Sequence, residues 1–152
     1  MMPGNEKYFP YDLEYSHIVR EIKTPVSIYS SPETTEGEYI KSDAIWDTGA
    51  THSVITPILT QKLGLNPVDK LKVSGIGQEV ESDIVVLTIL LPNGKVLTNR
   101  RFLVSNIPGA DVLIGMDIIS MGDFCISNAH GKTSFSFIIP PINDKILYSK
   151  LV

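Results

Sequence analysis

The feature of this sequence that most limits its fold is the shortness of its apolar runs. The longest run extends from Ile84 to Leu91 and is far shorter than the ~20 apolar residues that cross a bilayer. Strand-forming residues alternate with clusters of Gly, Pro, Ser and Asn, as is typical of short strands joined by turns. The pattern predicts strands at 17–29, 39–46, 71–73, 80–91, 100–104, 124–126 and 133–139. The sequence therefore predicts a mainly β fold.

The sequence predicts two of the connections between these strands. Asn93-Gly94 predicts a two-residue hairpin with a type I′ turn, in which both central residues have φ > 0. Residues 128–131 predict a second connection, across which 124–126 and 133–139 pair. Consecutive strands in this part of the chain are therefore expected to be neighbours in a sheet.

Helical signals are few and short. Thr56 as N-cap, Pro57 at the first helical position and Gly64 as the stop predict one short helix. Asp117 as N-cap and Gly122 as the stop predict a second. One or two small helices are compatible with a mainly β domain.

The chain of 152 residues fits one domain. Residues 1–14 lack periodicity and contain Pro3 and Pro10, so they are expected to form an N-terminal arm rather than a signal peptide. The main domain is expected at 15–140. Residues 141–152 are expected to form a C-terminal segment.

Composition excludes several classes of partner. The net charge of −4 gives no basic surface for nucleic acid or an anionic membrane. Cys125 is the single cysteine and cannot form an internal disulfide, which favours a reducing, cytoplasmic location. His17, His52 and His130 lack metal-ligand spacing, so no metal and no cofactor are expected.

The stretch AIWDTGATHSVI, residues 44–55, presents a carboxylate between an apolar strand and a glycine turn. Gly49 lets the backbone turn sharply, Thr48 offers a hydroxyl that can hold the loop, and Asp47 carries the carboxylate. The alternative is an ordinary surface turn, because such a tripeptide occurs by chance in roughly a few per cent of chains of this length.

The flanking residues favour the functional interpretation. Asp47-Thr48-Gly49-Ala50 with its apolar lead resembles the active-site loop of retroviral-type aspartic proteases, the retropepsins. The segment 110–119, ADVLIGMDII, resembles the family's second signature, two apolar residues and a glycine that lead into a short helix. The resemblance covers roughly residues 15–140. It implies a closed β-barrel-like retropepsin fold in which Leu113-Ile114-Gly115 packs as a floor beneath the Asp47 loop.

The resemblance also implies how one Asp-Thr-Gly loop could support catalysis. The family uses two such loops, whose carboxylates share a proton and activate one water. This sequence has one Asp-Thr-Gly loop. The second carboxylate is therefore expected to be Asp47 of another copy related by a twofold axis. The C-terminal segment 141–152 is a candidate for the contact between the two copies.

Gly75-Ile76-Gly77 lies where the family places the tip of its flap. Without the other motifs, this tripeptide would be read as a plain hairpin turn. In the resemblance, the glycines allow a mobile tip and Ile76 excludes water from the carboxylates when the flap closes. A peptide substrate would bind as an extended strand between flap and floor.

Other polar or reactive side chains have simpler explanations than catalysis. His52 is expected to be a structural loop residue, and Asp111 and Asp117 are expected to serve in turns or caps rather than as a second acid. Trp46 is expected in the core or in a dimer interface. Cys125 is expected to be a small buried apolar residue.

The sequence departs from the retroviral pattern at two places. Thr51-His52 replaces two acids that commonly follow the loop, and Met116 stands where an arginine often pairs with the first of them. The loss of both partners leaves neither charge unpaired. The resemblance therefore does not extend to the retroviral style of dimer contact and of substrate binding.

The sequence thus predicts a homodimeric aspartic endopeptidase of the cytoplasm that cleaves extended peptide segments. Two alternatives remain open: a non-catalytic dimeric β module that binds extended peptides, and an interaction domain whose Asp47 loops never pair. The intact Asp47-Thr48-Gly49-Ala50 favours the enzyme, because a binding module does not need the carboxylate.

Overall fold

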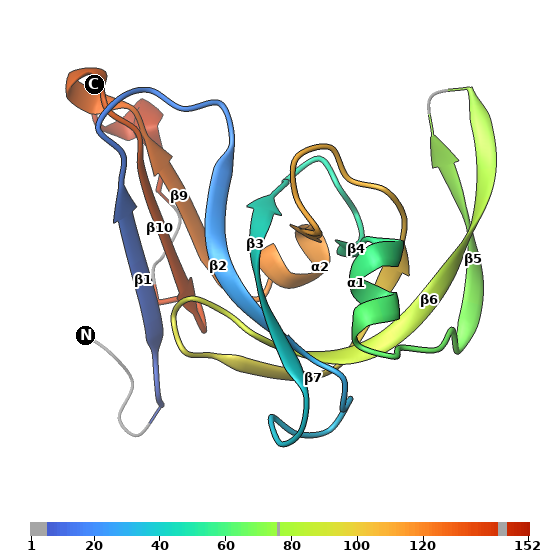
Figure 1. Cartoon of the computed structure of the whole chain (residues 1–152). Helices are drawn as coiled ribbons and strands as arrows, with labels where there is room; N and C mark the ends of the chain where they lie inside the picture. Colours follow the sequence, from blue (N-terminus) through green and yellow to red (C-terminus); the bar gives the residue numbers. More distant parts are fainter. Residues whose placement is uncertain (1–5, 76, 143–145) are drawn as a thin grey trace.

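The computed structural model describes residues 6–75, 77–142 and 146–152 (Figure 1). Its strands are β1 Phe9–Glu14, β2 Ile22–Tyr29, β3 Tyr39–Trp46, β4 Val54–Ile55, β5 Asp69–Gly75, β6 Gln78–Leu90, β7 Val96–Val104, β8 Val112–Ile114, β9 Asp123–Ser127 and β10 Ser134–Ile139. The α-helices are α1 Pro57–Lys62 and α2 Met116–Ile119, with short 3-10 turns at Ala129–Gly131 and Tyr148–Lys150. Within these described ranges, every helix is too short to cross a membrane.

The larger sheet closes on itself. Its strands follow the order β2-β3-β8-β4-β7-β6-β5, and β2 also pairs with β6. The pairs β3–β8 and β4–β7 are parallel, and the other pairs are antiparallel. The predicted mainly β, barrel-like fold is therefore confirmed. Beyond the closed part, β5 and the first half of β6 extend as a long hairpin, on the right of Figure 1.

A smaller sheet, in the order β1-β10-β9, covers one side of the barrel (Figure 1). Aromatic rings join the two sheets: Trp46 lies 4.8 Å from Phe137 and 5.2 Å from Phe135, measured between ring centroids. The Trp46 indole N–H donates to the Thr24 hydroxyl at 2.8 Å, so its polar atom is satisfied. Because Trp46 directly precedes Asp47, this packing anchors the base of the Asp47 loop in the core.

Two expectations about the smaller sheet differ from the structure. Residues 9–14, expected within a loose arm, form β1, which pairs with β10 from Phe9↔Ile139 to Glu14↔Ser134. Residues 1–5 lie outside the described residues. Cys125, expected to be buried, is exposed on β9, because the preceding Phe124 packs toward Trp46 and successive side chains of a strand point to opposite faces.

The predicted β6–β7 hairpin is present, but its turn is not type I′. The Gly94 N–H donates to Leu91 O at 3.0 Å and the Leu91 N–H to Lys95 O at 2.9 Å, so the loop has three residues. Only Gly94 in this loop has positive φ, at +85°. Pro92 fixes φ near −65° at the first central position, which favours a type I turn followed by a left-handed glycine.

Both predicted helices form, with different caps. Thr56 precedes α1, yet its hydroxyl donates to the Asp111 carboxylate at 2.7 Å instead of capping the helix. Gly64 follows α1 with φ of +62°, as expected for a glycine stop. The N-cap of α2 is Gly115, and Asp117 lies inside the first turn.

Candidate active site

The Asp47 loop begins where β3 ends and is held by backbone bonds. The Asp47 N–H donates to Ile114 O at 2.9 Å, and the Ala50 N–H donates to Asp47 O at 3.2 Å. The Gly49 N–H donates to Asp47 Oδ1 at 2.8 Å. The Asp47 side chain is half-buried. These bonds fix the direction of the carboxylate, while part of it remains accessible.

Thr48 at the tip of this loop is exposed. Its hydroxyl was expected to hold the loop, but it has no hydrogen-bond partner within the described residues of the chain. The loop is held instead by the Gly49 amide and by the segment around Gly115. The Thr48 hydroxyl is consequently free to contact a second molecule.

Gly115 packs directly against the Asp47 loop. A Cβ at Gly115 would lie 2.8 Å from the His52 carbonyl carbon and oxygen and 2.9 Å from Ala50 O. The next amide, that of Met116, donates to Ala50 O at 2.8 Å. The segment Leu113–Gly115 therefore lies in contact with the loop, and only glycine fits at its end. Met116 itself is 38% exposed.

Ser53 ties the end of the loop to α2 and was not singled out from the sequence. It is fully buried, and its N–H and hydroxyl donate to the two Asp117 carboxylate oxygens at 3.0 and 2.7 Å. Its hydroxyl oxygen accepts the Gly115 N–H at 3.1 Å. The local sequence shows only a serine directly before the apolar pair Val54-Ile55. Its hydrogen-bond partners are more than sixty residues away, so no local pattern reveals its role.

The two other acids near the loop already have structural partners. Asp117 accepts bonds from Ser53 and also from the Ile118 N–H at 3.0 Å. Asp111 accepts the Thr56 hydroxyl at 2.7 Å. Both carboxylates are therefore engaged in structural hydrogen bonds, although Asp117 bonds to Ser53 and does not cap α2 as expected.

The predicted flap corresponds to the connection between β5 and β6. Gly75 pairs with Gln78 at the end of the ladder, and Gly77 has φ of +82°, which favours glycine. Ile76 lies outside the described residues. Figure 1 shows this hairpin rising away from the barrel on the side where α1 lies. Within the tip, Gln78 to Val80 are exposed.

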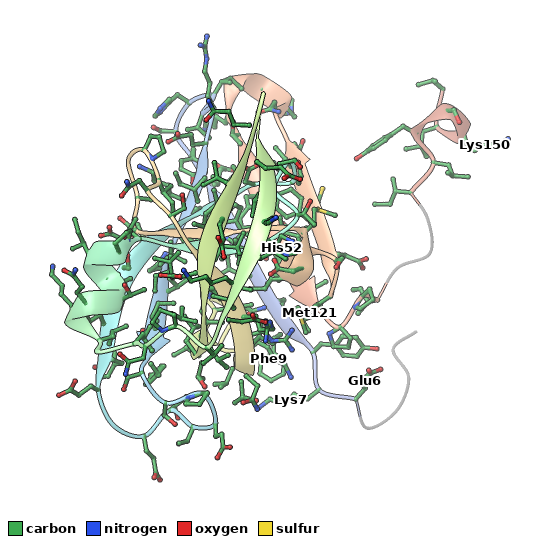
Figure 2. All side chains as sticks on the ribbon, turned by 90° about the vertical axis from the view of Figure 1, so that its right-hand side faces the viewer. Glu6, Lys7, Phe9, His52, Met121 and Lys150 are labelled. Carbon is green, nitrogen blue, oxygen red and sulfur yellow. The ribbon has the colours of Figure 1, made fainter. Side chains whose placement is uncertain are left out.

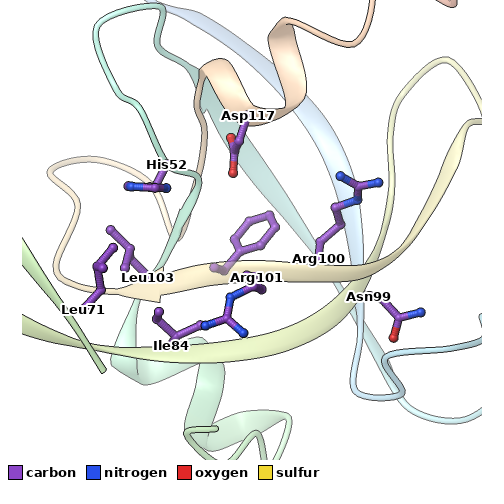
Figure 3. Close-up of a pocket in the computed structure, with 9 residues that line it drawn as sticks. His52, Leu71, Ile84, Asn99, Arg100, Arg101, Leu103 and Asp117 are labelled. Carbon is purple, nitrogen blue, oxygen red and sulfur yellow. The ribbon is translucent and has the colours of Figure 1, made fainter. Parts of the chain in front are cut away.

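Two adjoining cavities lie between the Asp47 loop and the hairpin. One of about 450 Å³ is lined by the loop residues 49–52 and by 71–74 of β5. The other, of about 410 Å³, is shown in Figure 3 and extends along β7. The cavities share His52, Leu71 and Leu103. His52, expected to be structural, is exposed and lines both of them. In the described part of the chain, no cluster of three or more His, Cys, Asp or Glu side chains could hold a metal.

Solved structures share this fold. A retropepsin-like aspartic protease from Rickettsia conorii has a TM-score of 0.55 at 16% identity, with 88% of this chain and 96% of that chain covered. The EIAV protease, solved with the inhibitor HBY-793, has a TM-score of 0.51 at 26% identity, with 70% and 90% covered. The fold is therefore that of the retropepsin-like aspartic proteases.

The sequence itself gives the family. The model of the aspartyl protease family matches residues 34–118, which is more than half of the chain. No curated protein matches the sequence. The chain belongs to the aspartyl protease family, and both family and fold support a protease function.

Proposed function

We propose that this protein is an aspartic endopeptidase that acts as a homodimer. One Asp47 carboxylate from each copy would share a proton, and the pair would activate one water for attack on a peptide carbonyl. The Asp47 that is ionised accepts a proton from the water, and the protonated one donates to the carbonyl oxygen. An extended peptide would lie between the loop and the β5–β6 hairpin.

The observation that carries this proposal is that, of Asp47, Asp111 and Asp117, only Asp47 has a carboxylate that is not bonded to another side chain. Its carboxylate is held by the Gly49 amide and remains half-exposed, whereas Asp111 and Asp117 are bonded to Thr56 and Ser53. A single carboxylate cannot serve as base and acid at once. A second copy therefore supplies the missing group most simply, with the exposed tip of the loop facing its counterpart.

We assign the contact between copies to the C-terminal segment. Ile146, Leu147, Tyr148 and Leu151 are at least half exposed, which is unusual for large apolar side chains so close together. Figure 2 shows this segment, marked by Lys150, standing away from the body of the protein. A chain ending at Ile142 should be monomeric by analytical ultracentrifugation where the full chain is dimeric. An unchanged sedimentation coefficient would remove this segment from the contact.

Asp47→Asn tests the chemistry. It keeps the shape of the side chain and removes the ionisable group from both halves, so peptide cleavage should fall at least a thousandfold, on the order expected when an acid–base group is lost. Asp43→Asn removes the same charge from an exposed position on β3 and should cleave like wild type. Cleavage by Asp47→Asn at the rate of the control would end the proposal.

Mixing tests whether the site is shared. When wild-type and Asp47→Asn chains are combined in equal amounts and allowed to exchange, about a quarter of the dimers are wild-type pairs. Activity per wild-type chain should therefore fall to about half if both carboxylates are needed. A monomeric enzyme would show no loss per wild-type chain.

The same variant separates the enzyme from the non-catalytic alternative. A dimeric peptide-binding module would bind an extended peptide equally well in the wild-type and the Asp47→Asn protein, and neither protein would cleave it. The wild-type chain is therefore the deciding sample: binding without cleavage would favour the module.

A cytoplasmic location remains a prediction from the single cysteine.

A further inference from the structure

The cavity in Figure 3 contains a basic group that the proposed reaction does not use. Its lining consists of His52, Leu71, Ile84, Asn99, Arg100, Arg101, Phe102, Leu103 and Asp117. Figure 3 shows Arg100, His52 and Asp117 on the same side of β7, while Arg101 points to the other side. The cavity thus combines an apolar wall with one guanidinium group directed to the face that carries α2.

Arg100 has no partner for its charge in the described part of the chain. Its Nε is buried and makes no hydrogen bond. The ion pairs of the described residues do not include it. A buried donor without an acceptor is costly, so an acceptor from outside the chain would stabilise this arrangement.

The neighbouring charged groups do not meet this need. Asp117 already accepts three hydrogen bonds, from Ser53 and from the Ile118 amide, at 2.7 to 3.0 Å. Arg101 donates to Asp69 at 3.0 Å on the opposite side of β7. Arg100 is therefore the one guanidinium at this cavity that remains available to a ligand within the described residues.

The cavity is also within reach of a substrate at Asp47. It shares His52, Leu71 and Leu103 with the cavity that is lined by the Asp47 loop and β5. In an extended peptide, alternate side chains point to the same face and each residue advances the chain by about 3.3 Å. A peptide that lies over Asp47 can therefore place a side chain into the cavity beside Arg100, away from the bond that is cleaved.

We propose that this cavity is a specificity subsite in which Arg100 binds the carboxylate of a glutamate or aspartate side chain of the peptide substrate. The proposal rests on the proposed protease function and adds the substrate class. A planar guanidinium can donate two parallel hydrogen bonds to one carboxylate. The chain carries a net charge of −4, so the preference for an acid would be local to this cavity.

The test compares matched peptides. A peptide that the wild-type protein cleaves is resynthesised with Glu, or with the isosteric Gln, at each position in turn. At one position removed from the cleaved bond, the Glu peptide should have a kcat/KM about ten- to a hundredfold above the Gln peptide, the range expected for a hydrogen bond between charged groups. No such position would overturn the proposal.

Variants then assign the effect to a residue. Arg100→Gln should bring the ratio of Glu to Gln peptides to about one, and Arg100→Lys should retain part of it because the charge remains. Arg20→Gln is the control, since it removes an exposed arginine outside the cavity. If the ratio falls in Arg101→Gln and not in Arg100→Gln, the assignment to Arg100 is wrong.

Two further measurements separate this proposal from other failures. Binding of the labelled Glu peptide to the Asp47→Asn protein, with and without Arg100→Gln, tests the subsite when no cleavage occurs. A tenfold or greater loss of affinity for Glu but not for Gln supports the subsite even if the protease function fails. Equal losses of affinity for both peptides would overturn the proposal. If a thermal melt shows that Arg100→Gln is unfolded, Arg100→Lys decides, and the absence of a preference for Glu in Arg100→Lys would overturn the proposal.

Discussion

The Asp47 loop and the β5–β6 hairpin line the same groove, yet the loop and the tip of the hairpin are held in opposite ways. The loop is tied to β8 and α2 by bonds to Ile114, Met116 and Asp117 and by the close packing of Gly115. The tip is held by the ladder between its two strands, and Gln78 to Val80 are exposed. A segment with few buried contacts opens at lower free energy than one with many.

Under the proposed function, this difference would suit two tasks. The proposed pairing of two Asp47 carboxylates requires close positioning, which the hydrogen bonds around Ser53 would provide. The proposed flap would have to move to admit a peptide, and its exposed tip is compatible with that movement. Substitutions around the Asp47 loop should therefore lower stability as well as cleavage, whereas substitutions at the tip should lower kcat/KM with a smaller effect on stability.

The largest effect is expected for Gly115→Ala. The added Cβ would lie within 3 Å of three backbone atoms of the Asp47 loop, none of which can turn away as a side chain can. Overpacking of this kind should lower the free energy of unfolding by about 3 kcal/mol and abolish cleavage. Gly37→Ala is the comparison: it has no neighbour within 4 Å but a φ of +95°, so its cost comes from the backbone alone and should be smaller. Urea denaturation measures both, and equal stability of the two variants would contradict the packing argument.

Ser53→Ala should have the next largest effect. It removes the hydroxyl that donates to Asp117 and leaves the buried Gly115 amide without its acceptor. A loss of about 2 kcal/mol in the free energy of unfolding is expected, with a fall in kcat. Ser105→Ala changes an exposed serine after β7 and should be neutral. A stable, fully active Ser53→Ala would show that the network does not position the loop.

Gly77→Val tests the other region. Valine resists the φ of +82° and stiffens the tip, so kcat/KM should fall at least tenfold, while the melting temperature should fall less than in Ser53→Ala. Gly37→Val places the same side chain at a similar φ outside the groove and should leave kcat/KM unchanged. Hydrogen exchange should also be faster at the tip than at the Asp47 loop, and equal protection would argue against a flap.

The smallest effect is expected at the base of the hairpin. The hydrogen bond from the Lys70 amide and the Arg101 guanidinium lower the pKa of Asp69. A carboxyl whose pKa is lowered in the folded protein stabilises it above the unfolded pKa, and this contribution is lost as the pH falls through the folded pKa. Asp69→Asn should therefore lower the melting temperature slightly at pH 7 and not at strongly acid pH. A constant difference between the melts at both pH values would exclude the ionic contribution.

The Asp47 loop could be read from the sequence because its signals are local. A strand ending in Asp47, a glycine turn and an apolar segment before Gly115 are each visible within about ten residues. The strand at 39–46 was predicted with its observed bounds for the same reason.

What the sequence did not reveal depends on distant partners. β1 is a strand because β10 pairs with it across more than a hundred residues, and Cys125 is exposed because Phe124 beside it occupies the face that packs toward Trp46. Thr56 resembled a helix cap, but its hydroxyl binds Asp111. The role of Ser53 depends on Asp117, which no local pattern indicates.

The parallel pairing of β3 with β8 has a consequence for synthesis. Ser53 and Asp117 are 64 residues apart, and the ribosome adds about 5–20 residues per second. For several seconds, an emerging chain contains Asp47 without the segment that bonds to its loop. We expect the unfinished chain to lack a formed site. If the proposed peptidase activity holds, the chain would therefore be inactive while it and its neighbours on the polysome are still unfolded.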